Sequence, residues 1–304
     1  MEPNYRAFGL TLGSDLALPG LPTTADEPTI RIRRTAVPQW LGEPTVQYGE
    51  RFRFRGQECA IRFPLHGFSG RVTNGNLIEF ESDPTHDDVS RLHVLGSCSG
   101  ALLFQRGLVP LHGNAVSRHD GSLIVVGRIG AGKSTTTMAL LQHGYSLVAD
   151  DISGIDFDSH ELAVAPGYPR IKLWKNTLEQ FGLNDRALER VRFDLEKFNY
   201  PVDRAFCEKP KKLEAIYVLH PGDSTEVKIR PLSGLEKLES LRPHLYKMRF
   251  ADAVRNWPPV LAKICRLADS VRVNVLERPS EGVTIEEVAE AIDKDMAQAA
   301  ESRP

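Results

Sequence analysis

The sequence predicts an α/β protein with a β-rich N-terminal region, on three observations. Short runs of β-branched and aromatic residues, separated by Gly, Pro and Asn-Gly, fill most of the first hundred positions. A glycine-rich loop between an apolar run and a helical pattern follows at 122–143. Strand-like and helix-like segments then alternate toward the C-terminus. We therefore predict a β-rich domain with a bridging helix at 1–107 and an α/β domain at 108–304.

Composition and charge exclude several classes of protein. The chain has 304 residues, of which 41% are hydrophobic, so it can build a large core. Its formal net charge is −2, so we expect no nucleic-acid partner. No apolar run reaches the length of a membrane span and the first residues do not read as a signal peptide, so we expect no membrane association and a cytoplasmic protein. The sequence leaves the oligomeric state open, a homo-oligomer included.

The cysteines carry no recognisable site. They are widely spaced, without a C-x-x-C pair or a Cys/His cluster of zinc-site spacing, at Cys59, Cys98, Cys207 and Cys265. We interpret them as free thiols.

In the N-terminal region we predict strands and one bridging helix. The strands are expected at 29–34, 47–54, 58–63 and 77–80. Asp87-Asp88 opens a segment with apolar residues at helical spacing, which predicts an amphipathic helix ending near Gly107. Nothing in this region resembles a catalytic cluster.

The segment Gly127–Ser134 fits the phosphate-binding pattern G-x-x-x-x-G-K-[ST]. An apolar run at 122–126 predicts a buried strand before it, and 133–143 predicts a helix that stops at Gly144. Glycines let backbone N–H groups surround phosphate oxygens, and the helix N-terminus adds its dipole. We expect nucleotide contacts from Gly127, Arg128, Ile129, Gly130, Ala131, Gly132, Lys133, Ser134 and Thr135.

Within this loop, Lys133 would neutralise β- and γ-phosphate oxygens and the Ser134 hydroxyl would bind Mg²⁺. ATP and Mg²⁺ are therefore the expected ligands. The alternative, a glycine-rich turn that binds nothing, is disfavoured by the strand and helix on either side.

A β-hairpin is predicted just before the loop. The run 111–118 and the loop's strand are joined through Asp120-Gly121, a strong hairpin signal. A two-residue turn at Asp120-Gly121 would pair Ser117 with Ile124 and place His112 opposite Ile129. His112 would then lie beside the phosphate loop, where it could contact the γ-phosphate or help to position the acceptor. The alternative is a strand-end histidine satisfied by the backbone.

Two carboxylates end the next predicted strand, 145–149. The connecting helix is barely long enough for a crossover, so this strand should lie parallel and near to the first. It would bring Asp150 and Asp151 to the carboxyl edge of the sheet, where α/β folds bind ligands. One could support Mg²⁺ and the other accept the proton of an acceptor hydroxyl. Because strand neighbours face opposite sides, we expect separate roles.

The rest of the chain predicts further alternating elements. On a strand at 170–174, Arg170 and Lys172 could each reach a phosphate or simply be solvated. Strands are expected at 213–219, at 227–232 as its neighbour, and at 271–276. Helices are expected at 178–181, 187–191, 235–248 and 254–267. Thr284 to Glu287 forms a capping box that opens a last helix to about Met296.

The order of these motifs resembles one known family. His112-Gly113, the phosphate loop and Leu147-Val148-Ala149-Asp150-Asp151 have the order and spacing of the HPr serine kinase/phosphorylase catalytic domain. The match is close over 111–151. It implies a phosphoenolpyruvate-carboxykinase-like nucleotide core in 108–304, with His112 at the phosphates. It also implies one aspartate as base and the other as metal-side ligand, and we favour Asp150 as base and Asp151, with Ser134, at the metal.

Elsewhere the sequence departs from that family. The arginine-glycine-rich signature after the catalytic core is absent and 166–174 stands in its place. The N-terminal part does not look like the usual regulatory domain. These stretches look more like the stand-alone kinases encoded with peptide natural products, among them lasso-peptide tailoring kinases that phosphorylate the C-terminal serine of a precursor. The resemblance thus implies an ATP-dependent serine kinase with a peptide substrate.

Two other functions stay open. One is an HPr serine kinase/phosphorylase. The other is a non-catalytic nucleotide-binding regulatory or assembly factor, against which the paired aspartates argue, because a binding module needs no base.

Overall fold

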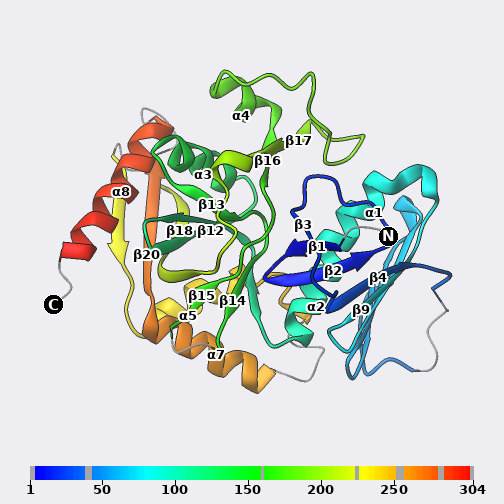
Figure 1. The fold of residues 1–304 in the computed structure, drawn as a ribbon. Helices are drawn as coiled ribbons and strands as arrows, with labels where there is room; N and C mark the ends of the chain where they lie inside the picture. The colour runs from blue at the N-terminus through cyan, green and yellow to red at the C-terminus, as the bar shows by residue number, and fades with distance from the viewer. Residues whose placement is uncertain are drawn as a thin grey trace.

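The computed structural model describes residues 4–37, 43–158, 161–222, 226–250, 257–279 and 284–301. Two large sheets joined by a helical segment make up the fold, with the β-rich N-terminal sheet at one end and the α/β part at the other (Figure 1). The predicted mixed α/β class is confirmed. In the described ranges, no helix is both long and apolar enough to cross a lipid bilayer. The division into domains at 107/108 stays a prediction.

In the part of the chain that the structure describes, the first sheet holds nine strands in the order β3-β1-β2-β4-β9-β8-β7-β6-β5. They are β1 (Asn4–Ala7), β2 (Leu10–Ser14), β3 (Thr23–Thr24), β4 (Ile30–Arg34), β5 (Val46–Tyr48), β6 (Phe52–Arg55), β7 (Glu58–Phe63), β8 (Phe68–Thr73) and β9 (Leu77–Glu81). The strand predicted at 47–54 is in fact two, because Gly49, with φ +57°, turns the chain between β5 and β6.

A nearly continuous helical segment leads from the first sheet to the second. It comprises α1 (Asp87–His93), a π-helical turn (Val94–Cys98) and α2 (Ser99–Gln105). The predicted extent is confirmed, but the predicted amphipathic character is wrong. From His93 to Phe104 every residue is buried, because this segment packs in the core shared by both sheets.

The second sheet follows the order β10-β14-β15-β18-β12-β11-β13, with β20 on β18 and β19 on β20. Its strands are β10 (Val109–Leu111), β11 (Gly113–Arg118), β12 (Gly121–Gly127), β13 (Ser146–Ala149), β14 (Ser153–Asp156), β15 (Ala163–Val164), β18 (Lys211–Gly222), β19 (Lys228–Pro231) and β20 (Arg272–Pro279). β12, β18 and β20 are parallel neighbours, while β11 is antiparallel to both β12 and β13. A separate ribbon pairs β16 (Arg170–Trp174) with β17 (Lys197–Pro201).

Helices cover both faces of this sheet (Figure 1). They are α3 (Lys133–Gln142), α5 (Leu235–Leu241), α7 (Trp257–Ser270) and α8 (Ile285–Glu301), while α4 (Lys175–Gln180) lies beside β16. Leu123 and Val125 of β12 face the core under α3 and α8, whereas Ile124 and Val126 face the core shared with α5 and α7. Burial on both faces explains the continuous apolar run that predicted this strand.

Several predicted elements need correction. Residues 187–191 form turns and a single bridge between Arg190 and Phe198, not a helix. β19 pairs with β20 and not with β18. The helix predicted at 235–248 ends at Leu241, where Pro243 follows in a 3₁₀ turn, and 254–256 of the next predicted helix lie outside the described residues.

The C-terminal helix α8 confirms the predicted capping box. Thr284 N donates to Glu287 Oε2 (2.7 Å) and Glu287 N donates to Thr284 Oγ1 (3.3 Å). The helix itself extends past Met296 to Glu301.

The segment 244–247 ties the two sheets together. His244 O accepts from His112 N (2.7 Å), and Tyr246 N donates to Pro110 O (2.8 Å). The Tyr246 ring packs so closely on α2 that a Cβ at Gly100 would lie 2.5 Å from it. Lys247, with φ +47°, turns its ammonium toward four aromatic rings at 5.1–5.8 Å, those of Phe52, Phe63, Tyr246 and Phe250.

Gly100→Ala should destabilise the protein by about 1–3 kcal/mol, because the new methyl group overlaps the buried Tyr246 ring. Gly96→Ala is the matched control, since its Cβ would stand 3.7 Å from Tyr246 Oη, an ordinary contact, and should be neutral or stabilising by up to about 1 kcal/mol. Urea unfolding of both variants measures this. Equal stability of the two would contradict the described packing of Tyr246.

Candidate active site

The phosphate loop connects β12 to α3 as predicted. Gly130 and Gly132 have φ of +84° and +93°, a left-handed conformation that favours glycine, and Gly132 is the residue before the first turn of α3. Lys133 Nζ donates to Gly127 O (2.9 Å) and to Arg128 O (3.2 Å). Burial lowers the pKa of Lys133, and Asp151 opposes this shift.

The hairpin before the loop exists, but its predicted register is wrong by two residues. Ser117 pairs with Ser122 and Gly113 with Val126, so the turn residues are His119 and Asp120. His119 takes φ +55°, the positive value that the turn requires. His112 is consequently level with Gly127, the first residue of the loop, and does not lie opposite Ile129.

A close backbone approach explains why glycine follows His112. A Cβ at Gly113 would stand 2.7 Å from Val125 O, so β11 and β12 could not pair here with a larger residue. This pairing holds His112 at the sheet edge, where its Nδ1 lies 3.1 Å from Asp151 O and 3.2 Å from Asp151 Oδ1. The predicted neighbourhood of His112 and the loop therefore survives the change of register.

The strand β13 runs in the same direction as β12, as predicted, but β11 lies between them. Asp150 and Asp151 follow its last residue. The expectation that they face opposite sides is wrong, because Asp151 leaves the strand with φ +66° and both residues line one cleft. Aspartate tolerates this conformation better than most residues.

Lys172 of β16 joins the two carboxylates. Its backbone N donates to Asp150 Oδ2 (3.1 Å), and its Nζ donates to Asp151 Oδ2 (2.9 Å). The sequence left open whether Lys172 reaches a phosphate or is solvated. The residue is only 8% exposed and acts as the counter-charge of the aspartates.

Burial and charge separate the two aspartates. Burial, with a contribution from Asp151, raises the pKa of Asp150 to about 6, although Lys172 opposes the shift. Burial also tends to raise the pKa of Asp151, but Lys172 and His112 outweigh it and hold that pKa well below its usual range. At neutral pH one carboxylate is thus a better proton acceptor and the other is firmly ionised.

A cleft of about 740 Å³ brings these groups together. From the predicted site it contains His112, Ile129, Gly130, Gly132, Lys133, Ser134, Thr135, Asp150 and Asp151. Gly127, Arg128 and Ala131 shape the loop without lining the cleft. The opposite wall comes from the end of β16, the start of α4 and the start of β17, at Trp174–Thr177 and 194–197.

The donors in the cleft fit a magnesium–nucleotide complex. Mg²⁺ is typically held by one or two carboxylates together with substrate phosphates and waters. Ser134 and Asp151 supply a hydroxyl and an ionised carboxylate. Within the described ranges no cluster of three or more His, Cys, Asp or Glu side chains could hold a metal ion alone, so the ligand set would depend on phosphate oxygens.

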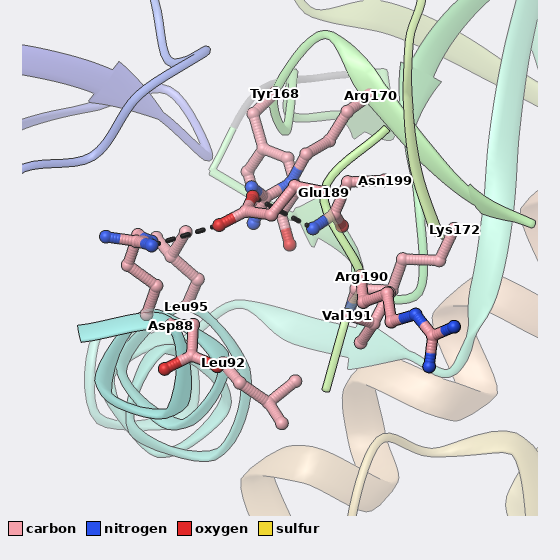
Figure 2. A pocket seen from close by; sticks show the side chains of 11 residues that line it. Asp88, Leu92, Leu95, Tyr168, Arg170, Lys172, Glu189, Arg190, Val191 and Asn199 are labelled. Carbon is pink, nitrogen blue, oxygen red and sulfur yellow. Dashed lines mark hydrogen bonds and ion pairs between the residues drawn. The ribbon is translucent and has the colours of Figure 1, made fainter. Parts of the chain in front are cut away.

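A second hollow lies behind Lys172, between α1 and the β16–β17 ribbon (Figure 2). Arg91 bonds Glu189 across it (2.9 Å), and Asn199 Nδ2 donates to Glu189 Oε2 (3.2 Å). Its volume of about 20 Å³ is enough for about one water molecule. Arg170 lines this hollow with its guanidinium over the Tyr168 ring, so it does not face the nucleotide cleft.

Sequence reasoning missed several residues that line the cleft, among them Asn114, Trp174 and Lys197. Asn114 is 2% exposed, its Oδ1 accepts from Asp151 N (3.4 Å), and its Nδ2 has no partner among the described residues. The sequence spacing could have identified Asn114, because it stands two residues after His112 and strand residues at that spacing share a face. Trp174 and Lys197 had no local signal, since their place depends on the β16–β17 pairing.

Comparisons with known proteins add little to this geometry. No protein-family model matches the chain, and no curated protein matches it. Among solved structures it is similar to the Hpr(Ser) kinase/phosphatase from Coxiella burnetii, at 14% identity and a TM-score of 0.35. The similarity covers 63% of this chain and 92% of that one.

Proposed function

We propose that this chain is an ATP-dependent serine kinase that phosphorylates a peptide, in particular the C-terminal serine of a lasso-peptide precursor. The observation that carries the kinase proposal is the meeting of three groups in one cleft. The phosphate loop, His112 and the carboxylates of Asp150 and Asp151 all line it. A binding module would need the loop but not a buried carboxylate with a raised pKa.

The proposed chemistry assigns each residue a role. Asp150 takes the proton from the serine hydroxyl, the serine oxygen attacks the γ-phosphorus of ATP, and the bond from that phosphorus to the ADP oxygen breaks. Lys133 and the N–H groups of the loop stabilise the charge on the phosphate oxygens. Asp151 and Ser134 would hold Mg²⁺, which when bound neutralises phosphate charge. His112, beside Asp151, positions the reacting phosphate.

The form of the acceptor follows from the room in the cleft. A volume of about 740 Å³ lies in the range of about 300–1,000 Å³ typical for one small ligand. The phosphates of a nucleotide would occupy the part of the cleft next to the loop, so the acceptor would enter the remaining room, against Trp174–Thr177 and 194–197, as a narrow chain segment. Trp174, 45% exposed, with Lys197 Nζ 5.5 Å from its ring centre, offers an apolar and cationic surface at the opposite wall. These features favour a flexible peptide end over a folded domain.

Lys133→Ala should reduce phosphate transfer by at least about a hundredfold, because it removes a charge contact that strengthens in the transition state. Its melting temperature should stay close to that of the unaltered protein. Transfer measured beside a thermal melt checks this, with the exposed Lys228→Ala of β19 as the matched control. Retained transfer in a folded Lys133→Ala protein would refute the phosphate-loop assignment.

Asp150→Asn and Asp151→Asn should fail in different ways. The first should lower kcat by about 10²–10⁴-fold with little effect on Mg·ATP affinity, since it removes only the base. In the unaltered protein kcat should rise as the pH passes about 6, because the base must be deprotonated and the pKa of Asp150 is raised to about 6.

Asp151→Asn should instead weaken binding of Mg²⁺ and nucleotide, while asparagine preserves the positive φ of that residue. The measurements are pH–rate profiles and magnesium titrations of both variants. Equal effects on kcat and affinity in the two proteins would contradict the separate roles.

A short peptide ending in serine should gain one phosphate, whereas HPr should gain little or none. The reason is that acceptor selection is expected from the segments that differ from HPr kinases, and the cleft favours a narrow chain end. Incubation with ATP and Mg²⁺ followed by mass spectrometry checks this, with the same peptide ending in alanine as control. Efficient labelling of HPr without labelling of the peptide would overturn the peptide substrate and favour an HPr kinase.

A further inference from the structure

We infer that Arg278 binds the phosphate chain of the nucleotide from the side opposite the two aspartates. The nucleoside then lies toward the ends of β18 and β20. This inference rests on the proposed function, since it takes the loop 127–134 to bind ATP. It adds the direction in which the nucleotide lies and a residue that holds it.

The first observation is a close approach between distant parts of the chain. A Cβ at Gly132 would stand 2.7 Å from Arg278 Nη1, so the guanidinium lies directly on the loop. Gly132 is the N-cap of α3, whose first free N–H groups and dipole point to the anion site. Arg278 is therefore within reach of the same anion as Lys133, but it comes from β20.

The sheet order fixes the side from which Arg278 approaches. β11, which His112 precedes, and β13, which the aspartates follow, lie on one side of β12, and β18 and β20 lie on the other. Gly127 is level with Leu219 of β18, which is level with Leu276 of β20. Both strands continue past this level, to Gly222 and Pro279, and form a ledge beside the loop.

The charge of Arg278 supports a ligand role. Arg272, on the same strand, is neutralised by Asp295 of α8 at 3.1 Å. Among the described residues no hydrogen bond or ion pair joins Arg278 to a protein carboxylate. Its guanidinium instead stands near a loop that already carries Lys133. Two cations that converge there repel each other when no ligand is bound, whereas a polyphosphate between them attracts both.

The direction of the nucleotide follows from these positions. The transferred γ-phosphate must lie beside Asp150, on the β13 side, for its acceptor to lose a proton to that residue. The α- and β-phosphates then extend across the loop toward Arg278, which donates to their oxygens. The ribose and base follow along the ledge formed by 220–222 and 277–279. Arg278 thus contacts phosphates that ATP and ADP share.

The experiment is calorimetric binding of Mg·ATP and Mg·ADP to the full chain and to Arg278→Ala, with kcat measured at saturating ATP. The dissociation constants of both nucleotides should rise by about tenfold and by the same factor, because a charge-assisted contact to shared phosphates is lost. The kcat should stay within about threefold of the unaltered value. Arg278→Lys should restore part of the affinity, and Arg230→Ala, on the exposed strand β19, should change nothing.

The outcomes separate this inference from the function on which it rests. Unaltered affinity in Arg278→Ala, while the unaltered protein binds both nucleotides, would overturn the inference alone. A fall in kcat without a change in affinity would also overturn it, since Arg278 would then act on the transferred phosphate. If the unaltered protein bound neither nucleotide, the proposed kinase function would fail and this inference with it.

Discussion

The site depends on one strand that runs against its neighbours. β11 lies between β12 and β13 and is antiparallel to both, so its first residue stands at the edge where those two strands end. That edge therefore holds three groups: a histidine just before the start of β11, a phosphate loop after the end of β12, and two aspartates after the end of β13. The arrangement requires β11 and β12 to approach closely at Gly113, where no Cβ fits. Ser153 Oγ also donates to Gly113 O (3.0 Å), which holds this end of the strand from its other side.

Charge at this edge is organised around Lys172. Bringing two carboxylates out of water is costly unless they are paired and hydrogen-bonded. Lys172 provides both, with a backbone N–H for Asp150 and an ammonium for Asp151. The unequal pairing makes neighbouring residues chemically different: the more enclosed Asp150 has a raised pKa and holds its proton to higher pH, whereas Asp151, in contact with Lys172 and His112, has a lowered pKa. A kinase could use this difference to keep proton transfer and metal binding on separate groups.

The sequence predicted those parts of the site that depend on short-range geometry. Loop, strand and helix at 122–143 follow from glycine positions and apolar runs, and the structure has all three. The hairpin was identified correctly, but its register depended on which two residues form the turn. His119, and not Asp120 or Gly121, takes the positive φ of the turn, so the pairing shifts by two positions. An even shift keeps each side chain on its face, which is why His112 still reaches the loop.

Contacts between distant segments could not be predicted in this way. Arg278 meets Gly132 only because β18 lies beside β12 and β20 beside β18, and strand order is not encoded in any one stretch of sequence. Asp151 escaped the alternation rule because its backbone leaves the strand conformation. The helical segment 87–105 carries apolar residues on one expected face, yet its residues 93–104 are buried on all sides, since both sheets pack on it.

The segment 244–247 has a consequence for how the two sheets behave as a unit. At one end of this segment, His244 O accepts a hydrogen bond from His112 N. Three residues later, the Lys247 ammonium lies near the rings of Phe52 and Phe63 in the N-terminal sheet. The N-terminal sheet is therefore part of the scaffold that fixes the histidine. A protein cut at the sequence boundary near 107 would expose Tyr246 and remove two of the four rings around the Lys247 ammonium, those of Phe52 and Phe63. Replacing the N-terminal sheet would therefore also change the surroundings of the segment whose carbonyl accepts from the backbone of His112.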